Sequence, residues 1–334
     1  MNERKISVII PLYNAERYIR QCLISVLSSK FTDYEVVVVD DCSTDNSVAE
    51  VEKLLPHFGG RLKIFSTEKN SGGAGIPRDI GIKNSSGKYV TFLDNDDMIL
   101  PTALGDFYDV AEKFQADVVC TEKYFLFDDA DNFSGKNLKI HVSCPVEDLV
   151  SDPTPATDNL RARIQKTMDS DFFVLPWGRI YRRRFLLDNE IFFPQMQYGE
   201  DGNFGFKCFC LAEKYIHIPQ ITNLCRMRRN SASRASFETH EGVRVWLDVI
   251  TRNISDLAKF VDTLEVCQQD LEFRRRVLAA FIDKHFTLMQ QFFSKSSKHR
   301  AMKIFFDELQ NPALNQHGKN IITAHFFAEQ ALTR

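Results

Sequence analysis

The first 120 residues of the chain alternate short apolar runs with segments that carry apolar residues at helical spacing. Each run is four or five residues long and rich in β-branched and aromatic side chains, which favours a buried strand over a helix. Strands that alternate with helices predict an α/β fold with a doubly wound, mostly parallel sheet. The predicted strands are Ile6–Ile10, Glu35–Val39, Leu62–Phe65, Tyr89–Leu93 and Asp117–Cys120.

Carboxylates follow two of these strands directly: Asp40 and Asp41 follow one, and Asp94, Asp96 and Asp97 follow another. Right-handed crossovers place both strand ends at one edge of the sheet, where open α/β sheets bind ligands. Asp94 and Asp96 are two residues apart, so their side chains can point the same way. Carboxylates this close repel one another unless a cation lies among them, and Mg²⁺ or Mn²⁺ bound to phosphate oxygens would meet that need. The same residues also suit the N-cap of the next helix, and both interpretations stay open at this point.

Size and charge limit the classes of function. A chain of 334 residues can bury a large core and form two or three domains. A formal net charge of −3 argues against a nucleic-acid partner, and no apolar run reaches the roughly 18 residues that span a bilayer. The N-terminus has no secretory apolar segment, and eight cysteines in a chain of this length do not indicate a disulfide framework. We therefore expect a cytoplasmic protein, or one attached peripherally to the inner face of the plasma membrane.

Two common nucleotide-binding motifs are missing. Pro11–Asn14 stands where a dinucleotide-binding fold would carry G-x-G-x-x-G, and no glycine stretch continues into G-K-[ST]. The glycine-rich segment Ser71–Gly75 can instead approach a ligand closely. We divide the chain into residues 1–120, residues 121–235 and a helical region over 236–334.

Six motifs occur along the chain in a fixed order: Val8–Asn14 (VIIPLYN), Val38–Asp45 (VVDDCSTD), Gly75–Gly81 (GIPRDIG), Phe92–Asp97 (FLDNDD), Pro176–Arg182 (PWGRIYR) and Glu200–Asp201. This series resembles glycosyltransferase family 2, the inverting enzymes with the GT-A fold, over roughly the first two thirds of the chain. The ordered series is far more specific than any one motif. The resemblance implies that residues 1–120 form the nucleotide-sugar-binding half of a GT-A domain and residues 121–235 its acceptor-side half.

The resemblance also implies roles around a UDP-sugar donor. Pro11 and Tyr13 would line the base pocket, and Asp41 would accept a hydrogen bond from the uracil N3–H. Arg78 would face the diphosphate or the uracil, and Trp177 would form a wall against the donor or acceptor sugar. Each has a plainer alternative, namely helix capping for Asp41, a solvated helix surface for Arg78 and core packing for Trp177.

The D-x-D motif implies a Mn²⁺ or Mg²⁺ cofactor. Asp96 would be the direct metal ligand, Asp94 would lie nearer to the ribose or a metal-bound water, and Asn95 would contribute to donor binding. Asp97 would either support the site or cap the next helix.

Two residues depart from the family pattern: Asp79 stands where Asn is common, and Cys42 stands where Gly is usual. Neither touches the metal chemistry. We expect Asp79 to pair with a basic neighbour on its own helix.

Inverting transfer needs one base that deprotonates the acceptor hydroxyl, and the resemblance assigns this role to Asp201, with Glu200 beside it. The alternative is that both acids only supply favourable charge at a helix N-terminus. The basic segment Arg228–Arg234 is either a mobile lid over the diphosphate or a solvated loop.

The predicted C-terminal helices carry one apolar face with basic residues around it. One interpretation is contact with an anionic membrane near a lipid-linked acceptor. The other is a core stripe that packs on the catalytic part or on a second copy in a homodimer, and it is favoured because apolar stripes usually belong to a core. The apolar residues are Leu278, Phe281, Ile282, His285, Leu288, Met289, Phe292 and Phe293.

The expected function is transfer of a hexose or N-acetylhexosamine from a UDP-sugar to a glycan or lipid-linked glycan in bacterial surface-polysaccharide synthesis, such as lipopolysaccharide or capsule. A sugar-1-phosphate nucleotidyltransferase would need a glycine-rich, arginine-containing loop after the first strand, and Pro11–Asn14 is not one. A non-catalytic nucleotide-sugar-binding protein is a third possibility, disfavoured by the presence of Asp94, Asp96 and Asp201.

Overall fold

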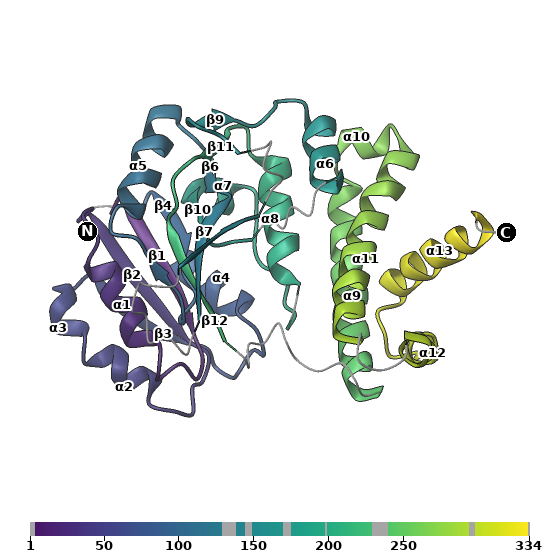
Figure 1. Ribbon diagram of the computed structural model, residues 1–334, viewed down its shortest axis with the longest axis horizontal. Helices are drawn as coiled ribbons and strands as arrows, with labels where there is room; N and C mark the ends of the chain where they lie inside the picture. Colours follow the sequence, from purple (N-terminus) through teal and green to yellow (C-terminus); the bar gives the residue numbers. More distant parts are fainter. Residues whose placement is uncertain are drawn as a thin grey trace.

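The computed structural model describes residues 4–128, 138–143, 149–169, 175–197, 199–228, 240–293 and 298–332. Figure 1 shows a sheet flanked by helices in one part of the molecule and a group of long helices in the other, which ends at the C-terminus. Helix α8 (Glu200–Leu211) lies between these two parts.

The main sheet crosses the first part of the molecule. Within the described residues it contains β1 (Ile6–Leu12), β2 (Tyr34–Asp40), β3 (Leu62–Ser66), β4 (Tyr89–Phe92), β6 (Val118–Thr121), β9 (Thr154–Pro155), β10 (Arg179–Arg182) and β11 (Tyr215–Ile218). Their order is β3-β2-β1-β4-β10-β6-β11-β9. The strands β1 to β4 pair in parallel, as do β6 and β11, which confirms the predicted mostly parallel sheet. Residues 1–120 and 121–235 therefore contribute strands to one sheet.

Helices cover both faces of this sheet, because each buried strand is apolar on both sides. In β2, Val36 and Val38 pack in one core cluster with α1 and α5, while Val37 and Val39 pack in a second cluster with α4, α7 and α8. The helices of this part are α1 (Ile19–Leu27), α2 (Ser47–Glu52), α3 (Leu55–Phe58), α4 (Gly75–Asn84), α5 (Ala103–Phe114), α6 (Leu160–Asp169), α7 (Arg183–Asp188) and α8.

Strand β10 was not predicted, although it runs antiparallel between β4 and β6 in the middle of the sheet. Its sequence, RIYR, begins and ends with arginine and therefore lacks the apolar signal of a central strand. The side chain of Arg179 is nevertheless buried, because its guanidinium pairs with the buried carboxylate of Glu122 at 3.6 Å. A hydrophobicity pattern therefore misses this strand, because the ion pair with Glu122 allows a charged residue to be buried.

A smaller sheet lies beside the main one. Within the described residues it contains β5 (Met98–Ile99), β7 (Lys123–Asp128), β8 (Lys139–Val142) and β12 (Asn223–Met227), in the order β5-β12-β7-β8. The polar and aromatic residues 122–144 predict a hairpin or an excursion, and β7 and β8 form an antiparallel pair there. The sequence also predicts short strands at Ile216–Ile218 and Leu224–Met227, which correspond to β11 and β12. This sheet carries β12 to the carboxylates that follow β4.

The first helix begins later than the sequence predicts. Apolar residues at helical spacing after Pro11 predict a helix from Tyr13 to about Ser28, whereas α1 begins at Ile19. Asn14 adopts a left-handed backbone with φ of 45°, and its side-chain oxygen accepts a hydrogen bond from the Thr44 N–H at 2.8 Å. Residues 13–18 are therefore tied to the loop after β2 rather than wound into the helix.

The C-terminal part consists of α9 (His240–Val261), α10 (Glu265–Gln268), α11 (Leu271–Phe293), α12 (Lys298–Leu309) and α13 (Gln316–Leu332). The long helix α9 contacts α8, α11, α12 and α13. No helix in the described ranges is both long and apolar enough to cross a bilayer.

The apolar face of α11 packs inside the chain where its side chains are described. Leu278 and Ile282 are buried in core clusters shared with α9. Among the basic neighbours, Arg274 pairs with Asp262 and Arg275 with Glu272. The side chains of residues 288–302 lie outside the described ones, so contact with a membrane or a second copy stays a prediction.

Close packing of α13 on α9 gives a test of the C-terminal part. A Cβ at Gly318 would overlap the backbone carbonyl of Thr251 on α9. Gly318→Ala should therefore lower the free energy of unfolding by about 1–3 kcal/mol, measured by urea denaturation. The matched control Gly105→Ala, in α5 with open space around its Cβ, should leave stability unchanged or raise it by up to about 1 kcal/mol. Equal losses for the two variants would contradict the packing.

Candidate active site

The carboxyl ends of β1, β2 and β4 meet at one edge of the main sheet. The register pairs Leu12 with Asp40 and Ile9 with Phe92, so the residues after each strand emerge side by side. Asp41 follows β2, and the segment from Asp94 follows β4. The edge predicted from the sequence to collect both acidic segments is therefore present.

Arg78 links this edge to α8. Its NH2 group donates to Asp94 Oδ1 at 2.8 Å, and its NH1 group donates to Asp201 Oδ1 at 2.6 Å. The Arg78 side chain is 3% exposed, whereas the side chains of Asp94 and Asp201 are each 31% exposed. The guanidinium thus brings the first aspartate of the D-x-D motif and the predicted base into one row.

The structure contradicts the plainer alternative for Arg78. The side chain is not a solvated helix arginine, because it is buried between its two carboxylates. A role as a diphosphate or uracil ligand stays a prediction.

Local backbone geometry explains how α4 comes so close to α8. A Cβ at Gly75, the first residue of α4, would lie 3.0 Å from Phe193 Cβ and 3.5 Å from Glu200 Cγ. The absence of a side chain there lets the start of α4 lie against the start of α8. The ring of Phe193 lies 5.2 Å from the Arg78 guanidinium carbon and closes its other side.

The two acids at the start of α8, Glu200 and Asp201, both have raised pKa values but differ in exposure. Burial raises the pKa of Glu200 to about 8, and the neighbouring Asp201 adds to this shift while Arg78 opposes it. Burial also raises the pKa of Asp201, against the lowering effect of Arg78. Glu200 is 7% exposed and lies 3.9 Å from Arg78, so it belongs to the wall of the site. The Asp201 side chain is 31% exposed, so that a substrate can reach its carboxylate, which fits the predicted division of roles.

The carboxylates of the D-x-D segment have separate partners. Asp96 Oδ2 lies 2.5 Å from Arg228 Nε, and Asp97 Oδ1 accepts from the Arg226 backbone N–H at 2.7 Å. Asp97 is buried, and its hydrogen bond to the Arg226 backbone joins β12 to this loop. The alternative that these acids cap the next helix is wrong, because α5 begins at Ala103 with Thr102 as its N-cap.

The donor set fits a hard divalent cation. Burial raises the pKa of Asp96, and Asp94 raises it further, while Arg228 lowers it. Asp94 and Asp96 offer carboxylate oxygen atoms, the ligand type that Mg²⁺ and Mn²⁺ prefer, and each now pairs with an arginine. Arg228 is the one described residue of the predicted lid Arg228–Arg234, and the others lie outside the described residues.

Asp41 lies in a pocket built by three residues that the sequence analysis did not identify. Its carboxylate accepts from Thr67 Oγ1 at 2.8 Å and from the N–H and Oγ of Ser71, each at 2.9 Å. Asn70 Nδ2 donates to the Asp41 carbonyl at 3.0 Å. These bonds hold the Asp41 carboxylate in one orientation at the sheet edge, which is what recognition of a single N–H group requires. Asp41 therefore does not cap a helix.

The remaining predicted residues surround the same edge. Asn95 Nδ2 donates to the carbonyl of Pro11 at 2.8 Å, which joins the D-x-D loop to the end of β1. Tyr13 is 47% exposed beside it. Cys42 has a left-handed backbone with φ of 60°, so the position where Gly is usual does require an unusual conformation. The half-buried Trp177 packs edge-on against Tyr124 at 4.8 Å between ring centroids, and its contact with a sugar stays a prediction.

The C-terminal helices hold the start of α8, which the sequence analysis also missed. Asn253 on α9 donates to the carbonyl of Gly199 at 3.0 Å, and its side-chain oxygen accepts from Asn203 at 2.9 Å. His285 on α11 donates through Nδ1 to the carbonyl of Phe281, so its Nε2 accepts the second Asn253 hydrogen at 3.4 Å. Gly199 has φ of 79°, and a Cβ there would meet Asn253 Nδ2 at 2.7 Å.

Removal of the Arg78 charge should destabilise the protein strongly. Arg78→Met keeps most of the side-chain volume but leaves the carboxylates of Asp94 and Asp201 without their buried partner, so the free energy of unfolding should fall by about 3–5 kcal/mol. The control Arg184→Met removes an 81% exposed arginine whose partner is Asp188, and should change stability by less than about 0.5 kcal/mol. Similar urea midpoints for both variants would contradict the claim that Arg78 stabilises the fold by pairing with Asp94 and Asp201.

The raised pKa of Glu200 predicts a specific pH dependence of stability. Its value of about 8 in the fold lies above the ordinary 4.5, so the folded protein binds more protons than the unfolded chain between these values. Stability should therefore fall as pH rises from about 5 to about 8, and Glu200→Gln should reduce that fall. The exposed control Glu190→Gln should keep the wild-type slope. Parallel urea midpoints for wild type and Glu200→Gln across this range would contradict the assignment.

Comparison with known proteins identifies relatives among bacterial enzymes. The chain is 31% identical to glycosyltransferase GlyA of Streptococcus pneumoniae serotype 4, over 78% of this chain and 36% of GlyA. It is 28% identical to the poly(ribitol-phosphate) beta-N-acetylglucosaminyltransferase TarS of Staphylococcus aureus (strain Mu50), over 85% of this chain and 44% of TarS. The chain thus spans less than half the length of these relatives.

Comparison of the structure with solved structures also identifies glycosyltransferases as relatives. A crystal structure of residues 1–349 of S. aureus TarS in complex with UDP-GlcNAc matches with a TM-score of 0.68 and 26% identity, over 91% of this chain and 79% of that one. This match confirms the GT-A fold followed by C-terminal helices. The pattern of glycosyl transferase family 2 matches residues 7–188. That span exceeds half of the 334 residues, and the chain belongs to glycosyl transferase family 2.

Proposed function

We propose that the chain is an inverting glycosyltransferase that moves a hexose or N-acetylhexosamine from a UDP-sugar to a glycan or lipid-linked glycan in bacterial surface-polysaccharide synthesis, as in lipopolysaccharide or capsule. The observation that carries the proposal is the row Asp94–Arg78–Asp201, which joins the D-x-D motif to a partly exposed carboxylate at the start of α8. The family membership and the UDP-GlcNAc bound to the related TarS support a UDP-sugar donor.

The donor would lie along the carboxyl edge of the sheet. Asp41, fixed by Thr67 and Ser71, would accept the uracil N3–H, and Pro11 and Tyr13 would flank the base. Asp94 and Asn95 would contact the ribose and diphosphate side. The sugar would then lie between the D-x-D loop and the start of α8, which Arg78 holds together.

The chemistry needs one base. The acceptor oxygen forms a bond to the anomeric carbon while the bond from that carbon to the diphosphate oxygen breaks, and its electron pair leaves with UDP. The acceptor proton passes to the Asp201 carboxylate, whose raised pKa favours proton uptake. One attack inverts the anomeric centre, so a nucleophilic carboxylate of the kind used by retaining glycosidases is not required.

Asp96 and Asp94 would hold the divalent cation that the donor set fits. When bound, Mn²⁺ or Mg²⁺ supplies positive charge that stabilises the departing diphosphate. Arg228, which now pairs with Asp96, would then be available to the phosphate oxygens.

The first test is a donor screen, in which UDP release is measured with UDP-Glc, UDP-Gal, UDP-GlcNAc and UDP-GalNAc. We expect release from at least one donor. Asp201→Asn should slow it by about 10²- to 10⁴-fold because the base is lost, while the affinity for UDP stays close to wild type. The control Asp188→Asn, at a side chain that is 61% exposed, should keep full activity. Wild-type turnover in Asp201→Asn would remove the base assignment, and no release from any donor would favour a non-catalytic binding protein.

Metal dependence is tested in the same assay. EDTA followed by dialysis should stop UDP release, and Mn²⁺ or Mg²⁺ should restore it, because the cation held by Asp96 would stabilise the departing diphosphate. Asp96→Asn should raise the metal concentration needed for half-maximal activity. Full activity after thorough chelation would contradict the cofactor proposal.

A further inference from the structure

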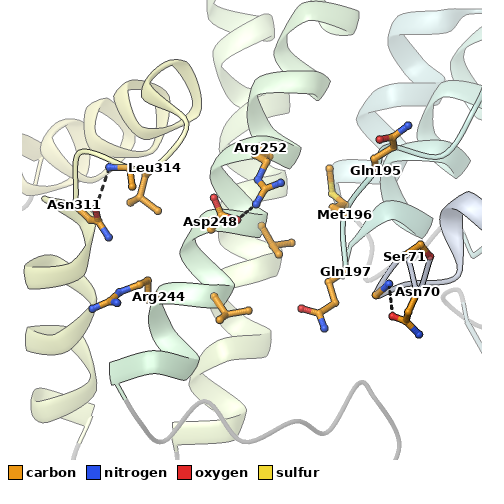
Figure 2. A pocket seen from close by; sticks show the side chains of 14 residues that line it. Asn70, Ser71, Gln195, Met196, Gln197, Arg244, Asp248, Arg252, Asn311 and Leu314 are labelled. Atoms are coloured by element: carbon orange, nitrogen blue, oxygen red, sulfur yellow. Dashed lines mark hydrogen bonds and ion pairs between the residues drawn. The ribbon is translucent and has the colours of Figure 1, made fainter. Parts of the chain in front are cut away.

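A cleft of about 500 Å³ lies between the catalytic part and the C-terminal helices. One wall is formed by Asn70, Ser71 and Gly72 together with Gln195, Met196 and Gln197, and the other by α9 and the turn between α12 and α13. Figure 2 shows these two walls facing each other, with Gln197 on the catalytic side and Arg244, Asp248 and Arg252 along α9. We call this space the interdomain cleft. Its volume lies in the range of pockets that hold small ligands.

Both segments of the catalytic wall continue into the proposed active site. Ser71 donates two hydrogen bonds to the Asp41 carboxylate, so the residues that line the cleft also hold the uracil partner. On the other segment, Gln197 precedes the base Asp201 by four positions. A molecule in the cleft would therefore contact both the loop that holds Asp41 and the segment that leads into α8.

The opposite wall is held at a fixed distance. Asn253 on α9 bonds to Gly199 and Asn203 at 3.0 and 2.9 Å, and Lys207 on α8 bonds to Asp256 on α9 at 2.6 Å. These contacts join α9 to α8 directly beside the cleft. The cleft is thus a preformed feature of the fold, which lowers the entropic cost of binding.

The charged residues that line the cleft are Arg244, Asp248 and Arg252. Each guanidinium already has a carboxylate partner: Arg252 pairs with Asp248 inside the cleft (Figure 2), and Arg244 lies 3.1 Å from a carboxylate oxygen of Glu308, outside the lining. A polyanion would have to displace these partners and would meet the Asp248 carboxylate, whereas an uncharged ligand would displace neither.

The rest of the lining suits a sugar ring. Val245 and Met196 offer apolar surface for the C–H face of a pyranose. The amides of Gln195 and Gln197 are exposed and have no hydrogen-bond partner in the part of the chain that the structure describes. An amide offers both a donor and an acceptor, as the hydroxyl groups of a sugar require.

We propose that the interdomain cleft binds the acceptor as a chain of uncharged sugar units, one or two units behind the hydroxyl that attacks the donor. This inference rests on the proposed function. It assigns to the C-terminal helices a direct part in acceptor binding, and it assigns to this chain a neutral glycan rather than a phosphate-bearing polymer.

The test is direct binding, which needs no turnover. Labelled protein with saturating UDP is applied to an array of neutral, sialylated and phosphorylated oligosaccharides. Val245→Trp fills the cleft from a side chain that is 37% exposed, and Ile24→Trp is the matched control on α1, where the native side chain is 42% exposed. UDP affinity of each variant reports that its donor side is folded.

Wild type and Ile24→Trp should bind neutral oligosaccharides, and Val245→Trp should lose this binding. The double variant Gln195→Ala, Gln197→Ala should bind the same glycans at least about tenfold more weakly, because two hydrogen bonds are removed. Binding that survives in Val245→Trp, binding confined to anionic glycans, or no binding to any glycan would each overturn the proposal. A failed donor screen would instead overturn the proposed function, since the array reports binding even without catalysis.

Discussion

The buried guanidinium of Arg78 is the interaction on which the arrangement of the site depends. Removing an arginine from water is costly, and two carboxylates at 2.6 and 2.8 Å offset that cost. Because the partners lie on different elements, the same charge balance fixes α4, the loop after β4 and the start of α8 relative to one another. The two carboxylates keep part of their surface exposed, so the charge that stabilises the fold is also the charge available for chemistry.

Much of the α/β part could be predicted from the sequence, since its strands are uniformly apolar and its acidic residues follow the strands directly. The helix at Glu200 was also predictable, because a glycine and two acids mark its start. The pattern failed where burial depends on a distant partner. Strand β10 begins with Arg179, which only the buried Glu122 makes tolerable, and α1 starts late because Asn14 bonds to Thr44 across the loop.

The same limitation applies to the site residues. Asp41, Asp94 and Asp201 could be named in advance, yet nothing local indicates that Arg78 joins the last two. The supports of Asp41 at Thr67 and Ser71 are ordinary polar residues in a loop, and the pairing of Asn253 with Gly199 spans 54 positions. Hydrogen-bond partners far apart in sequence leave no periodic signal, so they become visible only in three dimensions.

The C-terminal helices are part of the catalytic architecture in this account. They hold the backbone before the proposed base through Asn253 and supply one wall of the interdomain cleft. A variant far along the chain, at α9 or α11, can therefore alter the geometry at Asp201 without any contact to the donor.

The central claim is that one row of side chains, Asp94–Arg78–Asp201, borders the reacting carbon of a sugar nucleotide. The most direct measurement is a crystal structure with UDP-GlcNAc and Mn²⁺ bound. The account predicts that the anomeric carbon faces the Asp201 carboxylate with room for a single hydroxyl between them, and that the Arg78 bridge stays intact. A sugar turned away from α8, or a bridge broken so that Asp201 points out of the cleft, would contradict it.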